Sequence, residues 1–423
     1  MAETQEVRDK VVLVGLNSPV LKKEENADED TMEELSALVE TAGGETVGIV
    51  LQNRPSPDPR TFIGEGKVAE VQLYCENTGA TMVIFDNDLS PSQMRVLTEL
   101  LGVQVLDRCG LILDIFAQRA KTKEGRLQVE LAQYQYLLPR LTGMWTHLER
   151  QAGTSGKGPI GSKGPGETQL ETDRRHIRRK IDKLREDLEE VRRVRSTQRQ
   201  RRQKNEIPVV AIVGYTNAGK STLLNTLTDA GVLAEDKLFA TLDPTARALR
   251  LPDGRQVLLL DTVGFVRRLP HQLVQAFRST LEEAVAADVL VNVCDASDPE
   301  VLEQRDVTVS LLRELGCTEQ PVLTVWNKCD VVPVPDIAPP GGIAISAKTG
   351  MGIPALLEEL ARVLPPDRRR VTLLLPFREG GLAQECREDG AVESEEYQPE
   401  GLRMTVTLGL RMLSRVEPYI IEE

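Results

Sequence analysis

The stretch GYTNAGKS, residues 214–221, constrains the fold of this chain more than any other feature. It follows the apolar run IPVVAIV and precedes TLLNTLT, whose apolar residues have helical spacing. A strand that enters a loop of the form G-x-x-x-x-G-K-[ST] and continues into a helix is typical of a P-loop in an α/β domain. We therefore predict a phosphate-binding α/β domain around this stretch.

Each residue type in this loop has a physical role. Glycines at 214 and 219 allow the backbone to turn so that its N–H groups face the β-phosphate. Lys220 can reach the β- and γ-phosphates, and the Ser221 hydroxyl can bind Mg²⁺. The predicted phosphate-binding residues are Gly214, Tyr215, Thr216, Asn217, Ala218, Gly219, Lys220 and Ser221.

Two later motifs predict that the base is guanine. NKCD follows the apolar strand VLTVW, and SAK follows GIAIS. The Asp330 carboxylate can accept hydrogen bonds from the N1–H and 2-amino groups of guanine, whereas adenine would leave a buried carboxylate unpaired. The Lys328 stem can lie along the base, and SAK closes over its edge. The predicted base-binding residues are Asn327, Lys328, Cys329, Asp330, Ser346, Ala347 and Lys348.

Two further segments are expected to respond to the γ-phosphate. DTVG ends the strand QVLLL, so that Asp261 can hold Mg²⁺ through water and the Gly264 N–H can meet the γ-phosphate. FATLDPT supplies Thr241 as a second hydroxyl for Mg²⁺. The predicted residues of these segments are Asp261, Thr262, Val263 and Gly264, with Phe239, Ala240, Thr241, Leu242 and Asp243. We assign catalytic roles to Lys220, Thr241 and Gly264, and metal binding to Ser221 and Thr241.

Two residues of the site leave alternatives open. Phe265 occupies the position after D-x-x-G where many GTPases carry Gln, and a phenyl ring cannot orient the attacking water. Either another side chain of this chain does so, or a bound partner supplies the missing help. Asn217 either serves as a turn residue that tolerates unusual backbone angles or, as the resemblance to GTPases with Asn at this position implies, helps hold a K⁺ ion beside the phosphates.

Composition places this site in a soluble, multidomain chain. The 423 residues are 40% hydrophobic and 28% charged, and the net charge of −13 argues against bulk nucleic-acid binding. No apolar run approaches the roughly 20 residues that span a bilayer, so we expect no membrane insertion. The N-terminus lacks the basic and cleavage regions of a signal peptide. Six scattered cysteines predict buried free thiols in a cytoplasmic protein.

The periodicity of the remaining sequence divides the chain into four predicted domains. Strands alternate with helices in residues 1–122, which predicts a small N-terminal α/β domain with a parallel sheet. Residues 123–206 carry two helices with coiled-coil-like seams. Residues 207–366 form the P-loop domain, and residues 367–423 form a small α+β domain.

The two predicted helices suggest an antiparallel hairpin joined by the Gly-rich segment 153–166. That segment is either a connector or a tip that becomes ordered on a partner. Residues 168–206 contain 14 Lys or Arg against 8 Asp or Glu, a local excess of six positive charges. This basic arm indicates either a polyanion contact or a solvated helix face.

Together, GYTNAGKS, FATLD, DTVGF, NKCD and SAK, with KGPGETQLETDRR upstream, resemble the HflX family of translational GTPases. The resemblance covers about residues 8–365. It implies a monomeric cytoplasmic enzyme that cycles between GTP and GDP with Mg²⁺ and binds the large (50S-type) ribosomal subunit and its ribosomal RNA. It also implies a role in splitting or rescuing stalled ribosomes.

Two other function classes remain open from the sequence. A ribosome-assembly or RNA-modification GTPase would share the same nucleotide motifs. A non-ribosomal regulatory GTPase would bind its target through the N-terminal domain. No lipidation motif or basic amphipathic helix with a strong apolar face favours attachment to a membrane.

Overall fold

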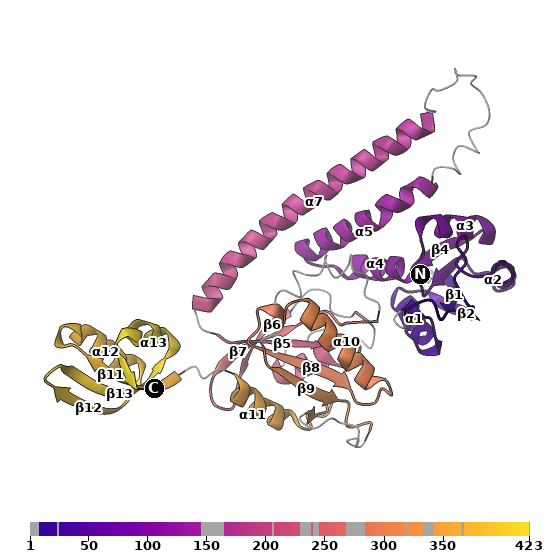
Figure 1. Cartoon of the computed structure of the whole chain (residues 1–423). Helices are drawn as coiled ribbons and strands as arrows, with labels where there is room; N and C mark the ends of the chain where they lie inside the picture. The colour runs from indigo at the N-terminus through magenta and orange to yellow at the C-terminus, as the bar shows by residue number, and fades with distance from the viewer. Residues whose placement is uncertain are drawn as a thin grey trace, which may run out of the picture.

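A computed structural model describes residues 8–22, 25–144, 165–204, 207–228, 238–239, 245–267, 284–317, 320–332, 342–364 and 368–422. Within these ranges three separate sheets and a long helical pair are present (Figure 1). The expected α/β class, with a P-loop domain between N-terminal and C-terminal domains, is confirmed. None of the helices in these ranges is long and apolar enough to cross a membrane.

The N-terminal sheet is parallel, with strand order β2-β1-β3-β4. Its elements are β1 (Lys10–Asn17), α1 (Glu29–Thr41), β2 (Glu45–Asn53), α2 (Glu65–Thr78), β3 (Met82–Phe85), α3 (Pro91–Leu101), β4 (Gln104–Asp107) and α4 (Arg108–Arg119). Local chemistry sets several of these ends. Asp28 and Ser90 form capping boxes before α1 and α3, and Gly79 ends α2 with a left-handed φ of 66°.

The sequence did not predict α4 as a helix. Its sequence, RCGLILDIFAQR, contains a glycine and a nearly continuous apolar run, and such a run does not show the spacing of a one-sided helix. In the structure, other parts of the protein cover α4 from several directions, so that apolar residues on most sides of the helix are buried. Ile112 and Phe116 are fully buried, and they belong to a core shared with the P-loop domain.

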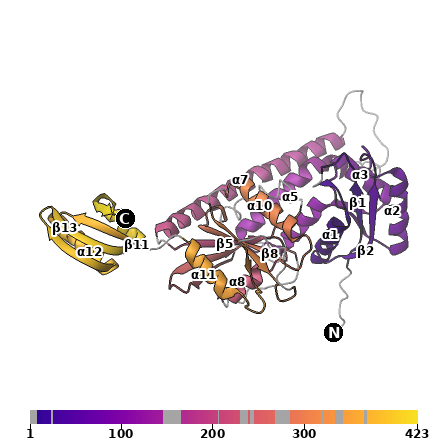
Figure 2. The same ribbon diagram turned by 60° about the horizontal axis from the view of Figure 1, so that its bottom comes forward.

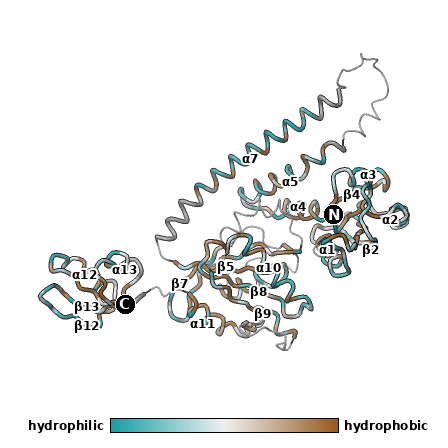
Figure 3. Tube along the Cα trace, in the orientation of Figure 1, coloured by the Kyte–Doolittle hydropathy of each residue, from teal (hydrophilic) through white to brown (hydrophobic). Residues whose placement is uncertain are grey.

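The helical region consists of α5 (Lys123–Met144) and α7 (Pro165–Lys204), which lie side by side and run in opposite directions (Figures 1 and 2). The predicted seam is present, and its buried residues are Leu131, Ile181, Leu184 and Leu188. Lys180 Nζ donates to Tyr134 Oη at 2.8 Å beside this seam. Figure 3 shows that α7 is mostly hydrophilic along its length, as expected for a helix with one narrow apolar stripe.

The predicted end of the Gly-rich segment was wrong. The Gly-rich segment was expected to extend to Gly166, but α7 already begins at Pro165. Proline is favoured in the first helical turn because its fixed φ suits the helix and its missing N–H would have no partner there. The remainder of that segment, residues 153–164, lies outside the described residues.

The P-loop domain has a six-stranded sheet of order β10-β9-β8-β5-β7-β6, in which only β6 is antiparallel to its neighbour. Its elements are β5 (Val209–Gly214), α8 (Lys220–Thr228), β6 (Thr245–Arg250), β7 (Gln256–Asp261), β8 (Val289–Asp295), α10 (Val301–Glu314), β9 (Val322–Asn327), β10 (Ile343–Ala344) and α11 (Ile353–Val363). The predicted nucleotide motifs follow β5, β7, β9 and β10. Parallel strands therefore bring them to one edge of the sheet.

The C-terminal domain is an antiparallel sheet of order β12-β13-β11-β14 with its own core. Its elements are β11 (Arg368–Leu375), η2 (Phe377–Glu379), α12 (Gly380–Asp389), β12 (Ala391–Gln398), β13 (Gly401–Gly409), α13 (Leu410–Val416), η3 (Glu417–Tyr419) and β14 (Ile420–Glu422). The acidic stretch from Glu385 to Glu400, for which the sequence predicts no strand, contains β12. β12 is an edge strand whose side chains are exposed, so it lacks the apolar alternation that identifies a half-buried strand.

All six cysteines are buried and free, as predicted. Their apolar surroundings explain this state. Burial raises the pKa of the Cys294 thiol to about 12, which keeps it protonated and unreactive.

Candidate nucleotide site

The P-loop connects β5 to α8 in a backbone conformation that requires glycine at two positions. Gly214 has a φ of 144° and Gly219 a φ of 91°. A Cβ atom at Gly214 would lie 2.2 Å from the Val293 carbonyl oxygen, and one at Gly219 would lie 2.2 Å from Asn327 Nδ2. The loop can therefore approach β8 and β9 closely, and the N-terminus of α8 faces the place where phosphates bind in such loops.

Lys220, the first residue of α8, is buried beneath this loop. Its Nζ donates to the Tyr215 carbonyl oxygen at 2.7 Å. Burial lowers the pKa of Lys220 to about 8, and the nearby Asp261 carboxylate only partly opposes this effect. Burial destabilises the charged form of Lys220, and Asp261 offsets only part of this cost. A bound phosphate would stabilise the ammonium group further, so Lys220 is well suited to bind phosphate oxygens.

The Ser221 hydroxyl and the Asp261 carboxylate meet beside the loop. Ser221 Oγ donates to Asp261 Oδ2 at 2.7 Å, and Asp261 is fully buried at the end of β7. Hydroxyl and carboxylate oxygens are the hard ligands that Mg²⁺ prefers, so this pair fits the predicted metal site. When bound there, Mg²⁺ would neutralise charge on the phosphates. Thr241, the other predicted ligand, lies outside the described residues, as do Ala240, Leu242 and Asp243.

The D-x-x-G loop lies directly against the P-loop. Phe265 N–H donates to the Gly214 carbonyl at 3.1 Å, and Thr216 N–H donates to the Phe265 carbonyl at 2.7 Å. Between them, a Cβ atom on Gly264 would lie 2.9 Å from Lys220 Nζ. Thr262 Oγ1 donates to the Ile212 carbonyl at 2.8 Å, and Val263 is also buried. Gly264 is thus held close to the lysine with which it is predicted to share the γ-phosphate.

Two aromatic side chains are buried beside the site: Phe239, which was a predicted site residue, and Phe265, which follows Gly264. Phe239 and Phe265 are each only 2% exposed and belong to the core shared with α4. The Phe239 ring meets the Phe116 ring edge-on, with centroids 4.5 Å apart. The Phe239 ring therefore contacts the N-terminal domain, and Phe265 belongs to the same core.

NKCD and SAK are joined to each other and to the P-loop by Asn327. Its Nδ2 donates to the Ala218 carbonyl at 2.8 Å, and its Oδ1 accepts from the Ala347 N–H at 2.9 Å. Thr226 Oγ1 of α8 also donates to the Ala347 carbonyl, at 2.6 Å. These hydrogen bonds hold the two base-binding motifs together at the neighbouring ends of β9 and β10. The Cys329 side chain plays no visible part in them, because its Sγ faces the Trp326 carbonyl at 3.3 Å.

Asp330 differs from the sequence expectation in one respect. It is exposed rather than buried, so the cost of leaving its carboxylate unpaired would arise only once a base covers it. A hydrogen bond from Ser346, helped by the charges of Lys348 and Lys328, lowers the pKa of Asp330. The carboxylate is therefore ionised and able to accept hydrogen bonds from guanine.

Sequence reasoning missed Asp295, which ends β8. Its Oδ2 lies 2.6 Å from Lys328 Nζ and fixes that lysine, whose backbone has an unusual φ of 63°. A carboxylate at the end of a strand beside β9 was the available signal, because adjacent parallel strands end at the same edge.

Comparison with known proteins agrees with this geometry. Three family models match successive parts of the chain: a GTP-binding GTPase N-terminal region (residues 29–117), a GTP-binding GTPase middle region (119–202) and a 50S ribosome-binding GTPase (209–328). The GTPase HflX of Caldanaerobacter subterraneus is 46% identical over 100% of this chain and 96% of its own length. The GTPase HflX of Escherichia coli K12 is 44% identical over 94% and 95%. This chain belongs to the HflX family of GTPases.

Membership of the HflX family establishes GTP binding and GTP hydrolysis as the activity of this chain. A solved structure of a GTP-binding protein from Sulfolobus solfataricus in complex with GDP is also similar, at 26% identity over 84% of this chain and 98% of that one, with a TM-score of 0.44.

Proposed function

We propose that this HflX-family GTPase binds the large ribosomal subunit and its ribosomal RNA in the cytoplasm, as a monomer, and splits or rescues stalled ribosomes. The family model that matches residues 209–328 is described as a 50S ribosome-binding GTPase, which supports the partner. GTP hydrolysis in this proposal resets binding rather than making a product.

The observation that carries the proposal is the position of the basic arm. In Figure 1, α7 lies on the outer side of the α5–α7 pair, and α5 lies between it and the N-terminal domain. Arg175, Arg178 and Arg179 are exposed on α7. Exposed guanidinium groups on an outer helix can meet RNA phosphates with release of counterions, whereas the rest of an acidic protein would be repelled.

Within the nucleotide site we propose the following roles. Lys220 and the P-loop amides stabilise charge on the phosphates, and Gly264 presents its N–H to the γ-phosphate. Ser221 and Thr241 hold Mg²⁺, and Asp330 reads guanine. Asn217 is exposed with a φ of 60°. This conformation suits a turn residue and also leaves its amide available to a K⁺ ion beside the phosphates.

The deciding experiment is co-sedimentation with purified ribosomal subunits in the presence of a non-hydrolysable GTP analogue. The unaltered chain should sediment with the large subunit, and a variant with Arg175, Arg178 and Arg179 changed to Glu should not. Sedimentation of whole ribosomes with GTP then tests splitting. Binding without splitting would favour an assembly or RNA-modification role, and no binding to either subunit would favour a non-ribosomal regulator.

A matched control carries the same change in charge elsewhere. Arg95, Arg313 and Arg378 are exposed on α3, α10 and η2, and their replacement by Glu should leave sedimentation with the large subunit unchanged. Equal loss in both triple variants would show that net charge, rather than the hairpin, decides binding.

We also propose that the Gly-rich segment enters a ribosomal RNA pocket. Lys157 and Lys163 could meet phosphate, and the low bulk of glycine permits close approach to RNA. Replacing residues 153–164 with a few Gly and Ser residues should leave basal GTPase activity intact and remove ribosome stimulation with its steep salt dependence. Undiminished stimulation would identify the segment as a connector.

A further inference from the structure

Three loops around the nucleotide site each place one aromatic ring in the core shared with the N-terminal domain. These rings are Tyr215 of the P-loop, Phe239 and Phe265, which are 6%, 2% and 2% exposed. Helix α4 supplies Phe116 to the same core. The position of all three loops therefore depends on packing against a different domain.

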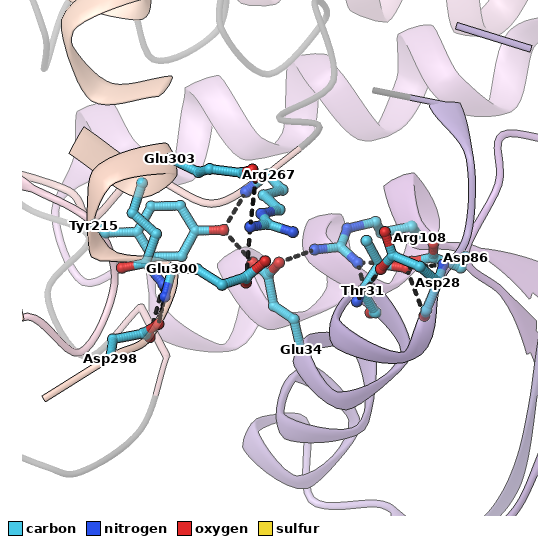
Figure 4. Close-up of polar contacts among 11 residues, drawn as sticks. Asp28, Thr31, Glu34, Asp86, Arg108, Tyr215, Arg267, Asp298, Glu300 and Glu303 are labelled. Atoms are coloured by element: carbon cyan, nitrogen blue, oxygen red, sulfur yellow. Dashed lines mark hydrogen bonds and ion pairs between the residues drawn. The ribbon is translucent and has the colours of Figure 1, made fainter. Parts of the chain in front are cut away.

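A polar chain lies at the edge of this apolar contact (Figure 4). Tyr215 Oη donates to Glu34 Oε1 on α1 at 2.8 Å and accepts from the Arg267 backbone N–H at 2.7 Å. Glu34 Oε2 lies 3.0 Å from Arg108 Nη2. The other end of that guanidinium, Nη1, contacts Asp86 Oδ1 at 2.7 Å.

The direction of these hydrogen bonds is fixed by protonation. Burial and the Glu34 carboxylate raise the pKa of Tyr215 well above its ordinary value, so its hydroxyl keeps its proton. Burial alone would lower the pKa of Arg108, but Glu34 and Asp86 outweigh it and raise the pKa, so the guanidinium stays charged. The single Tyr215 proton points to Glu34, which leaves an oxygen lone pair for the Arg267 amide.

This chain of contacts fixes the loop that follows Gly264. The backbone of Phe265 is bonded to Gly214 and Thr216, and two residues later the Arg267 N–H is bonded to Tyr215. The Arg267 side chain is held separately, because its Nη2 lies 2.7 Å from Glu300 and 3.4 Å from Glu303. Loops of this kind move with the γ-phosphate in GTPases, so their anchoring points bear on catalysis.

We propose that Glu34 is a positioning residue for GTP hydrolysis, acting through Tyr215. By orienting the Tyr215 hydroxyl, it holds the segment from Gly264 to Arg267 against the P-loop, where the Gly264 N–H can meet the γ-phosphate. A side chain of the N-terminal domain thereby completes the geometry of the GTPase site. This inference depends on the GTPase activity of the family and not on ribosome binding.

The test uses the full chain without ribosomes. Tyr215→Phe keeps the ring and removes only the hydroxyl, and Glu34→Ala removes the acceptor. Each should lower kcat for GTP hydrolysis by about fivefold, which is the effect of losing one hydrogen bond. The affinity for GDP should stay within about twofold of the unaltered chain, because Tyr215→Phe keeps the backbone N–H through which the P-loop is predicted to bind phosphate, and the base-binding motifs are unchanged.

Two further variants separate positioning from stability. Glu34→Gln retains an oxygen that accepts from Tyr215, so it should recover most of the kcat lost in Glu34→Ala. Glu33→Gln, on the exposed face of the same helix, should have no effect. The double variant Glu34→Ala with Tyr215→Phe should be no slower than Tyr215→Phe alone, since both changes break one pathway.

Several outcomes would overturn the inference. They are a kcat within twofold of the unaltered chain in Tyr215→Phe, a kcat that rises, additive losses in the double variant, or a loss in Glu34→Gln equal to that in Glu34→Ala. Because no ribosome is present, failure here leaves the proposed ribosomal role untouched, and failure of ribosome binding leaves this result untouched.

Discussion

The N-terminal sheet and the P-loop sheet have similar parallel architecture but use the carboxyl ends of their strands differently. In the N-terminal sheet, Asn87 after β3 bonds to the backbone of Leu16 and Glu25. Asp107 at the end of β4 accepts from Tyr136 and from Arg140. These polar groups are satisfied within the protein.

In the P-loop sheet, the same edge presents Lys220, Asp330 and a turn of backbone amides that are suited to a ligand. Parallel α/β architecture therefore does not specify a nucleotide site, and the residues at the strand ends do.

The largest expected effect comes from removing the positively charged Lys220 side chain at the edge of the P-loop sheet. Lys220→Ala should lower GTP hydrolysis by at least about 100-fold, corresponding to about 3 kcal/mol of lost charge stabilisation. Single-turnover hydrolysis of GTP measures this directly. The chain should remain folded by circular dichroism, and near-normal turnover would place the active site elsewhere.

The matching change in the N-terminal sheet should affect stability instead. Asp107→Ala leaves the partly buried Arg140 and the buried Tyr136 without their shared acceptor, and should destabilise the chain by about 3 kcal/mol. Denaturant unfolding checks the stability. GDP affinity measured under native conditions should be unchanged, and a selective loss of nucleotide binding would show that the N-terminal sheet carries part of the site.

A substitution at the base-binding site should change the preferred nucleotide rather than abolish nucleotide binding. Asp330→Asn should weaken GTP binding by at least about tenfold and improve xanthosine triphosphate binding, because an amide can donate to the oxygen at the xanthine 2-position. Competition between the two nucleotides measures the preference. An unchanged preference for GTP would show that Asp330 does not read the base.

The buried lysine should make nucleotide affinity depend on pH. Its pKa of about 8 in the free protein should rise when phosphates bind, so binding takes up a proton and affinity falls as the pH rises through 8. Between pH 7 and 8.5 the loss of the protonated form predicts about a fourfold weaker GDP affinity. Calorimetry in buffers of different ionisation enthalpy should show the proton uptake, and Lys220→Arg should remove it.

The smallest effect concerns the monovalent cation. If Asn217 helps to hold K⁺, basal hydrolysis should be severalfold faster in KCl than in NaCl at equal ionic strength, by analogy with other positioned charges. Asn217→Ala should then abolish the difference. Equal rates in the two salts would leave Asn217 as a turn residue.

The sequence by itself determined the local parts of this protein. The P-loop, NKCD and SAK were recognisable because each combines a residue pattern with an adjacent apolar strand, and strand ends in a parallel sheet converge. The alternation of strands and helices in the N-terminal domain as far as β4, and the seam of the hairpin, were predictable from periodicity alone. Helix α4 and strand β12 were not, because one is buried on most sides and the other is an exposed edge strand, so neither shows an alternation of apolar and polar residues.

Only the tertiary structure decided how the domains meet at the nucleotide site. Nothing in the residues around Glu34 indicates that this carboxylate reaches a tyrosine 181 positions away in the chain. The identity of Phe265 likewise does not show whether its ring lies beside a phosphate or in a core. Side-chain direction at an interface depends on which surfaces exclude water together. The exclusion of water between two surfaces depends on how the whole chain packs, so it cannot be predicted from a local pattern of residues.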